Sequence, residues 1–209
     1  MFSKNNTIIL HKKDGSIKKV KHIRGLHISC KGKNNCIEIW EPCNFVHKFF
    51  KRTSVIKILG DSNHIIIKGT EHSINTIKIK GVKNNNKIII GENLYQTGQL
   101  LVEFAHQSNL ELTVGNNCMF GQNVNIMLAD FHKILDLNSG EQTNQAKYGI
   151  NIGNHVWLAR NVNILKDISI SDNSIVGIGS TVTKSFNQQN VLICGAPAKI
   201  VKENIDWKI

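Results

Sequence analysis

The sequence IGNHVWLARNVNILKDISISDNSIVGIGSTVT, from Ile152 to Thr183, has an aliphatic residue at every sixth position. These residues are Ile152, Leu158, Ile164, Ile170, Val176 and Val182. A period of six matches neither the 3.6-residue turn of an α-helix nor the two-residue alternation of a long strand. It is typical of short strands joined by tight corners, with one aliphatic side chain of each strand turned inward. The hexapeptide repeat therefore predicts an all-β fold, the parallel β-helix.

The rest of the chain is expected to continue this solenoid, although its aliphatic residues are less regularly spaced. The six-residue period begins at Val114, stops after Ile126 and resumes at Ile152. The spacing of 38 between Val114 and Ile152 is not a multiple of six, so a polar loop at about 128–149 must leave the coil and return. Loops on a rigid scaffold often carry function. The expected parts of the single domain 1–209 are irregular coils at 1–113, regular hexads at 114–187, and a C-terminal strand and helix at 188–209.

A short helix is expected at the end of the chain. Pro197, in the run Gly195-Ala-Pro-Ala-Lys199, suits the first turn of a helix because its missing N–H costs nothing there. A helix from this point to about Trp207 would place Lys199 and Lys202, three residues apart, on one face.

The excess positive charge is confined to the first half of the chain. Residues 1–104 contain 18 Lys and Arg against 7 Asp and Glu, whereas residues 105–209 contain 8 of each, so the net charge of +11 lies entirely in the first half. A basic surface attracts nucleic acid, an anionic membrane or an acidic polymer. A solvated, lysine-rich surface explains the same composition equally well. An early cluster consists of Lys12, Lys13, Lys18, Lys19, Lys21 and Arg24.

The five cysteines are odd in number and lack CxxC spacing, so they indicate neither a disulfide framework nor a structural zinc site. Buried, reduced thiols are the better interpretation. No apolar run is long enough to span a bilayer, and the first residues lack the apolar stretch of a signal peptide. We therefore expect a cytoplasmic protein without a transmembrane segment. No metal-binding motif, phosphate-binding loop or dinucleotide fingerprint is found in the sequence.

Five short motifs between Asp130 and Trp207 carry a family resemblance. They are Asp130-Phe-His132, Ile152-Gly-Asn-His-Val-Trp157, Ile164-Leu-Lys166, Val176-Gly-Ile-Gly-Ser180 with Val182-Thr-Lys184, and Gly195-Ala-Pro-Ala-Lys199. Together they resemble the left-handed β-helix, hexapeptide-repeat acyltransferases. Within that superfamily, the chain is most similar to bacterial O-acetyltransferases that act on sialic-acid-containing capsular polysaccharides. The motifs are confined to the second half of the chain. The first half resembles the family only in its succession of short, β-rich runs.

The resemblance implies a fold, an assembly and a reaction. The coil would be left-handed, against the usual right-handed crossover of parallel strands. The protein would be a homotrimer with active sites in the grooves between subunits, and acetyl-CoA would lie along each groove as co-substrate. The acetyl group would pass directly to a hydroxyl of an acidic capsular or surface polysaccharide, without a metal. Nucleic acid is not an expected partner.

His132 is the expected general base. Transfer from a thioester to an alcohol needs a group that removes the hydroxyl proton, and imidazole suits neutral pH. The resemblance places the catalytic histidine of the family at His132, in the interrupting loop, although a surface histidine is the alternative interpretation. Asp130, two residues earlier, is a candidate for holding the imidazole in the useful tautomer, and an aspartate that caps a turn is an equally good explanation.

Trp157 is the second candidate for the catalytic site. It precedes the inward Leu158, so the alternation of a strand turns its side chain outward. In the capsule enzymes a tryptophan at this point belongs to the active site, where its ring N–H would donate to the thioester oxygen. Packing between subunits is the alternative. Main-chain N–H groups near Ala159 and Arg160 are further candidates for oxyanion donors.

The later hexads are expected to bind the coenzyme. The resemblance implies that main-chain groups at Ala159 and in the run from Gly177 to Ser180 line a channel for the pantetheine arm. Many relatives have a small residue where this chain has Ile178, so the larger side chain would narrow or reshape that channel. The remaining candidates, which ordinary surface polarity also explains, are Thr183 and Lys184 near the nucleotide and Lys199 and Lys202 at its phosphates.

Two other functions are compatible with the sequence. The enzyme could take a nucleotide-linked sugar or another small acceptor in place of a polymer. A non-catalytic solenoid could use its basic coils to bind an anionic polymer, with binding that weakens steeply with salt.

Overall fold

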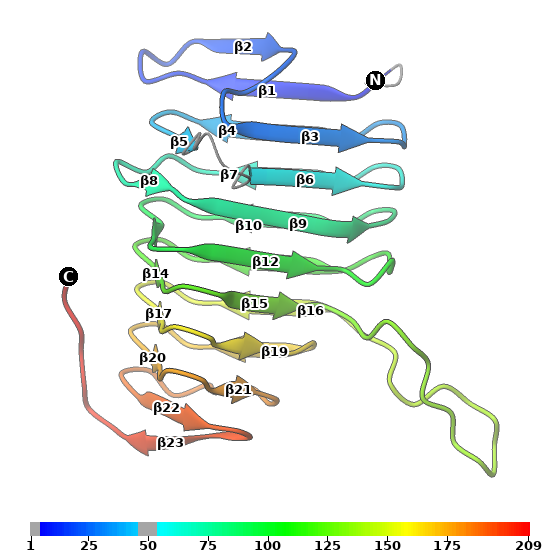
Figure 1. Ribbon diagram of the computed structural model, residues 1–209, viewed down its shortest axis with the longest axis vertical. Helices are drawn as coiled ribbons and strands as arrows, with labels where there is room; N and C mark the ends of the chain where they lie inside the picture. The colour runs from blue at the N-terminus through cyan, green and yellow to red at the C-terminus, as the bar shows by residue number, and fades with distance from the viewer. Residues whose placement is uncertain (1–4, 46–53) are drawn as a thin grey trace.

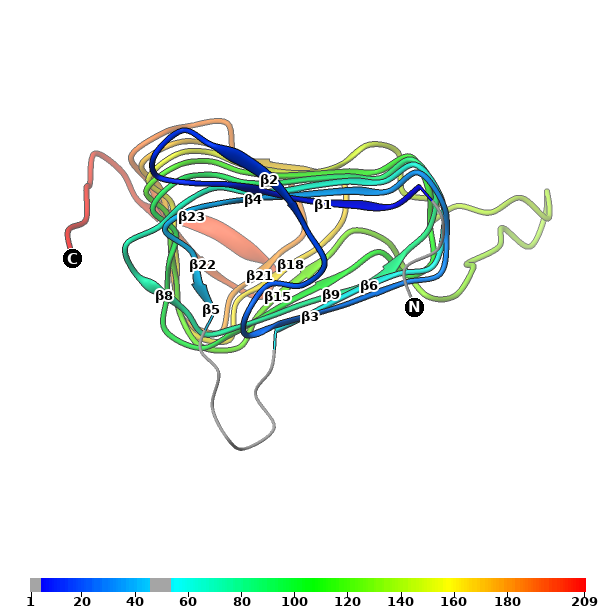
Figure 2. The same ribbon diagram turned by 90° about the horizontal axis from the view of Figure 1, so that it is seen from above.

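The computed structural model describes residues 5–45 and 54–209, and within them the chain forms β-strands and no helix. The strands stack as successive coils of a left-handed parallel β-helix with three faces (Figures 1 and 2). The predicted fold class is therefore confirmed. No helix in the described ranges has the length and apolar character needed to cross a membrane.

Each face is a sheet in which most strands pair in parallel with their equivalents one turn away. The first face contains β1 (Thr7–His11), β2 (Ile17–Val20), β4 (Cys36–Trp40), β7 (His64–Ile67), β10 (Lys87–Ile90), β13 (Glu111–Val114), β16 (Gly149–Ile152) and β19 (Ile168–Ile170). The second face contains β11 (Tyr95–Gln96), β14 (Met119–Phe120), β17 (Trp157–Leu158), β20 (Ile175–Val176), β22 (Leu192–Gly195) and β23 (Ala198–Lys202). The third face contains β3 (Leu26–Cys30), β6 (Ser54–Ile58), β9 (Thr76–Val82), β12 (Gln99–Glu103), β15 (Val124–Met127), β18 (Asn163–Ile164) and β21 (Thr181–Val182). A separate pair consists of β5 (Asn44–Phe45) and β8 (Ser73–Ile74).

The aliphatic residues of the repeat form the core, as predicted. All six from Ile152 to Val182 are 0% exposed. Leu158 stacks in register between Phe120 and Val176 of the neighbouring coils. Burial of one such side chain stabilises the fold by about 1.5–3 kcal/mol relative to its exposure to water, so the stack accounts for much of the stability of these coils.

Coil length explains why the period is lost in the first half. In the late coils Ile150 pairs with Ile168, so that one turn corresponds to three hexads. In the early coils the turn from Asn63 to Asn86 spans 23 residues, and the turn from Asn35 to Asn63 spans 28 residues. These early coils contain longer strands, such as the seven residues of β9. Their widths differ from one turn to the next, so no fixed period is seen in the sequence.

A ladder of buried asparagines runs through one corner of the early coils. The side-chain oxygen of Asn35 accepts from the main-chain N–H of Asn63 at 2.9 Å, that of Asn63 from Asn86 at 2.9 Å, and that of Asn86 from Leu110 at 2.9 Å. The side-chain N–H of Asn63 also donates to Asn35 at 2.8 Å. Each amide satisfies polar groups that the wide corner buries, and the ladder ends at Leu110, where the amide is replaced by an apolar side chain.

The chain leaves the coil after Met127 and returns at Gly149, within one residue of the predicted interruption. Residues 128–148, called the arm below, project from the edge between the third and first faces (Figures 1 and 2).

The predicted C-terminal helix is wrong. Residues 198–202 form strand β23, which pairs antiparallel with β22, and Pro197 lies in the connecting turn rather than in a first helical turn. The edge of β22 offers main-chain groups that a strand satisfies and a helix would not. Gly195 provides the positive φ of +105° that the tight reversal requires. Beyond β23 the chain runs without regular structure back along the coil to its end (Figure 1).

Candidate active site

His132 lies at the base of the arm with its side chain exposed, and Asn144 fixes the main chain around it. The buried amide of Asn144 donates to the carbonyl oxygen of His132 at 2.8 Å and accepts from the N–H of Ile134 at 2.9 Å. One side chain thus holds the backbone at His132 and two residues beyond it. The imidazole is left free to meet a substrate.

Asp130 does not form the predicted contact with His132. Its carboxylate accepts from the Lys166 ammonium at 2.5 Å and from the Asn144 side-chain N–H at 2.7 Å. Burial alone would raise the pKa of this carboxyl, but the hydrogen bonds from Lys166 and Asn144 outweigh it and lower the pKa. Asp130 therefore ties the base of the arm to the coil.

Asp167 anchors the other end of the arm. Its carboxylate accepts from the main-chain N–H groups of Lys147 and Tyr148, each at 3.0 Å, and the Tyr148 hydroxyl donates to the Asp167 carbonyl at 2.7 Å. The arm is thus attached at both ends by an aspartate. Between these ends its side chains are largely exposed.

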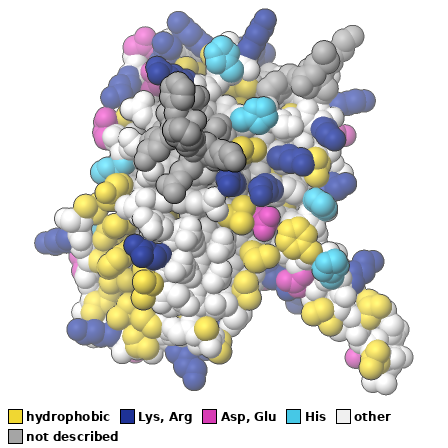
Figure 3. Space-filling model, viewed as in Figure 1, with side chains coloured by type: hydrophobic (Ala, Val, Ile, Leu, Met, Phe, Trp, Pro, Cys, Tyr) yellow, Lys and Arg dark blue, Asp and Glu magenta, His cyan; other side chains and the backbone are white. Residues whose placement is uncertain are grey.

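Trp157 faces outward on the second face, within an apolar column. The column consists of Tyr95, Met119, Trp157, Ile175 and Leu192, which are Cα partners from one coil to the next and are all half-buried. Figure 3 shows hydrophobic side chains gathered on the flank where Figure 1 places β14, β17, β20 and β22. Half-buried apolar side chains in such a column are suited to contact another surface.

The C-terminal tail covers one side of Trp157. The ring of Trp207 stacks on His155 with 4.2 Å between centroids and lies 6.0 Å from that of Trp157. The Trp207 ring N–H donates to the His155 carbonyl at 2.8 Å. His155 adopts a positive φ of 52° at a corner of the coil.

Arg160 has the better main-chain geometry of the two predicted oxyanion donors. The N–H of Ala159 already donates to the Val176 carbonyl at 2.9 Å. Across the described part of the chain, the N–H of Arg160 meets no acceptor. It is therefore free to donate to a ligand.

The run from Gly177 to Ser180, which was predicted to line the pantetheine arm, is only partly exposed to a ligand. Ile178 is 69% exposed, so its side chain stands on the surface of the coil. Ser180 is buried, and its hydroxyl accepts from the N–H of Gly195 at 3.1 Å. A Cβ on Gly177 would lie 2.4 Å from the sulfur of Cys194, so this position excludes a side chain.

The remaining coenzyme candidates are exposed polar residues near the end of the coil. Thr183 and Lys184 follow β21, and the Lys184 ammonium lies 5.7 Å from the ring of Phe186. Lys199 and Lys202 are exposed on β23. They lie on a strand with a register shift in its pairing, so the helical face expected to group them does not exist.

One chain does not bring the candidate catalytic residues together. His132 leaves the edge between the third and first faces, whereas Trp157 lies on the second face, across the coil from that edge. Three residues of this region escaped prediction because their contacts join distant parts of the sequence. They are Asn144, Lys166 and Trp207.

A left-handed coil of hexapeptide repeats, with one arm that carries an exposed histidine, defines the class of hexapeptide-repeat acyltransferases. The chain is 32% identical over 181 residues to a polysialic acid O-acetyltransferase of Neisseria meningitidis, which covers 84% of this chain and 76% of that protein. It therefore belongs to the family of the polysialic acid O-acetyltransferases. No family model matches the chain.

Two solved structures of the same family are similar over nearly the whole chain. The polySia specific acetyltransferase NeuO has a TM-score of 0.74 at 27% identity, covering 98% of this chain and 85% of its own. The polysialic acid O-acetyltransferase OatWY has a TM-score of 0.64 at 28% identity, covering 88% of each chain. The likeness therefore includes the irregular early coils as well as the hexads.

Proposed function

We propose that the chain transfers the acetyl group of acetyl-CoA to hydroxyls of an acidic, sialic-acid-containing capsular polysaccharide, in the cytoplasm and with His132 as general base. The observation that carries this proposal is the exposed imidazole of His132 on a backbone that Asn144 holds in place. Acetyl-CoA would supply an activated acetyl group as a thioester. His132 would accept the proton of the attacking hydroxyl and later return it to the leaving thiolate.

The active site would be completed between subunits of a homotrimer. The arm exposes apolar side chains that water does not favour: Phe131, Ile134, Leu135 and Leu137. The apolar column around Trp157 is a matching surface on the second face. Packing of the arm of one subunit near the second face of the next would bring His132 to Trp157, which one chain keeps apart.

In such a site the oxyanion of the transfer would need donors near Trp157. Its ring N–H and the free main-chain N–H of Arg160 are suited to that role. Ala159, Gly177 and Ile178 would border the pantetheine arm, with Ser180 behind them in the coil. Thr183, Lys184, Lys199 and Lys202 would lie toward the nucleotide, where the ammonium groups of the three lysines suit phosphate.

A pocket beside the arm supports an acidic acceptor. Phe131, the neighbour of His132, lines a cavity of about 140 Å³ whose other walls include Lys57, Lys80 and His106 and a single carboxylate, Glu103. Lys57 and Lys80 lie on β6 and β9 of the basic half. Two ammonium groups near the proposed base would attract a sugar carboxylate.

Thiol release from acetyl-CoA, followed with a chromogenic disulfide, tests the proposal. We expect release only when polysialic acid is added, and a loss of about 10²–10⁴-fold in kcat for His132→Ala. His27→Ala, an exposed histidine on β3, is the matched control. Normal turnover by His132→Ala would overturn the role of His132.

A panel of acceptors tests the polymer itself. Sialic acid monomer, a nucleotide-linked sugar and a neutral polysaccharide should each react far more slowly than the acidic polymer. Faster reaction with the nucleotide-linked sugar would replace the polymer with a small acceptor. Salt-sensitive polymer binding without any thiol release would instead favour the non-catalytic solenoid.

A further inference from the structure

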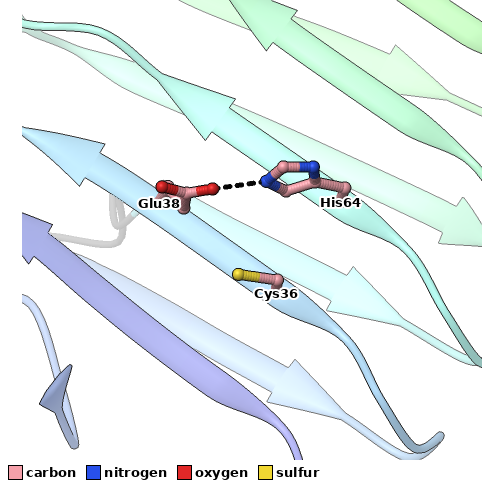
Figure 4. Close-up of side chains that lie close together, drawn as sticks. All are labelled: Cys36, Glu38 and His64. Carbon is pink, nitrogen blue, oxygen red and sulfur yellow. Dashed lines mark hydrogen bonds and ion pairs between the residues drawn. The ribbon is translucent and has the colours of Figure 1, made fainter.

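Three side chains with metal-binding atoms converge on the outside of the first face (Figure 4). Cys36 and Glu38 are two residues apart on β4, so both leave the same side of the sheet. His64 on β7 is the Cα partner of Cys36. Their sulfur, oxygen and nitrogen donor atoms all lie within 4.8 Å of one another.

We propose that Cys36, Glu38 and His64 bind one Zn²⁺ ion. A thiolate, an imidazole and a carboxylate are the ligands that zinc prefers, whereas Mg²⁺ and Ca²⁺ take oxygen ligands. In the tetrahedral geometry that zinc prefers, two atoms bound at about 2.0–2.3 Å lie about 3.3–3.8 Å apart. Side-chain rotations that separate Glu38 from His64 and bring the more distant donor atoms closer by about 1 Å would place all three around a single ion, with a fourth position for water.

One neighbour of the three ligands, His11, is placed to orient Glu38. Glu38 bridges two imidazoles, with 2.6 Å to His64 Nε2 and 2.7 Å to His11 Nε2. The ion would separate Glu38 from His64 and leave His11 on the other carboxylate oxygen. The ring of His11 is stacked on Trp40 at 3.7 Å, which fixes its direction. Outer partners of this kind orient metal ligands.

Charge and access are compatible with a cation. Lys87, the Cα partner of His64 on the next strand, is paired with Glu111 at 3.0 Å, so its charge is compensated. The side chains of Glu38 and His64 are 18% and 41% exposed, so an ion can enter from solvent. The bound ion would connect β4 and β7 directly, and β1 through His11. It would therefore stabilise the packing of the early coils, which lack the regular hexads of the second half.

Cobalt provides a direct test, because thiolate-bound Co²⁺ absorbs strongly in the near ultraviolet and in the visible. We expect the purified chain to bind one Co²⁺ with this charge-transfer band, and Zn²⁺ to displace it and remove the colour. Cys36→Ser should abolish the band, while Cys194→Ser, a half-buried thiol on β22, should retain it. Wild-type protein that binds no cobalt, or a band that survives Cys36→Ser, would overturn the proposal.

Affinity and melting temperature give a second measurement. His64→Ala should weaken Co²⁺ binding by at least ~100-fold, since loss of an outer partner alone, as in His11→Ala, costs about 10–100-fold. Zinc at a hundredfold excess over its Kd should raise the Tm of the wild type by about 5–10 °C. The Tm of a folded Cys36→Ser variant should not respond. An equal rise in both proteins would show that zinc binds elsewhere.

Discussion

The two halves of this solenoid solve the same packing problem with different side chains. The late coils complete a turn in three hexads and fill their interior mainly with aliphatic side chains. The early coils turn in 23 to 28 residues and stabilise a wide corner with a ladder of buried amides. All the excess positive charge is carried by the early half. We infer that the late half positions the reacting groups and the coenzyme, while the early half attracts the acceptor.

The largest effect is expected in the aliphatic stack of the late half. Ile164→Ala removes a fully buried side chain between Ile126 and Val182, and should reduce the free energy of unfolding by about 2–5 kcal/mol. Urea denaturation measures this loss. The control Asn151→Ala, exposed on β16, should change it by less than about 0.5 kcal/mol. Equal losses in both variants would mean that the hexad core does not dominate the stability of these coils.

The amide ladder of the early half should be nearly as sensitive. Asn63→Ala leaves the buried N–H of Asn86 and the carbonyl of Lys83 without partners. We expect a loss of about 2–4 kcal/mol in the same urea experiment, because each unsatisfied buried group costs about 1–3 kcal/mol. Asn187→Ala, an exposed asparagine in the late half, is the control. An unchanged free energy of unfolding in Asn63→Ala would show that water replaces the hydrogen bonds of the ladder.

The sequence was most informative where the repeat is strict. The inward position of Leu158 and the outward position of Trp157 both follow from the period, and so does the interruption before Ile152. In the early half the turn from Cys36 to His64 is longer than the three hexads of a late coil. The pairing that brings these two residues together could not be predicted from coils whose length varies.

Contacts across long sequence distances were also out of reach. Lys166 binds Asp130 across 36 residues, and Trp207 reaches His155 across 52. The C-terminal helix was predicted from a local preference of Pro197. The open edge of β22 outweighed that preference, because pairing satisfies main-chain groups along the whole of β23.

The arm interrupts the late half, and Asn144 should control its geometry. Asn144→Ala removes the hydrogen bonds to the His132 carbonyl and the Ile134 N–H, so the proposed base loses its fixed position. We expect kcat/KM to fall by about 10–100-fold, since a displacement of about 1 Å can cost about 10²-fold and a smaller one costs less. The neighbouring exposed residue gives the control Gln145→Ala. Circular dichroism should show an intact coil in both, and unchanged kcat/KM in Asn144→Ala would contradict the positioning role.

If the two halves bind different substrates, substitutions in each half should raise a different Michaelis constant. Lys57→Gln with Lys80→Gln should raise KM for the acidic polymer about 5–30-fold and leave KM for acetyl-CoA unchanged, because each exposed charge contributes about 0.5–1 kcal/mol. Lys199→Gln with Lys202→Gln should raise KM for acetyl-CoA and leave KM for the acidic polymer unchanged. Added salt should remove both differences. If either pair changed both constants alike, the halves would not divide the substrates as we infer.

The smallest effect concerns the ion pair at the base of the arm. Lys166 and Asn144 lower the pKa of Asp130 against the effect of burial, so the carboxylate is stabilised in the folded state. Its contribution is fully present above the unfolded pKa of about 3.9 and is lost as the pH falls through the lower, folded value. Because the pair is partly exposed, we expect less than about 1 kcal/mol.

Hydrogen exchange of the Ile134 N–H, which is bonded to Asn144, reports on this pair. After correction for intrinsic rates, protection should be constant from neutral pH down to about pH 4 and fall below it. Lys166→Met should lower protection already at neutral pH and move the acid loss to higher pH, because the carboxyl loses the group that lowers its pKa. Protection that follows pH identically in both proteins would mean that Asn144 alone holds the arm to the coil.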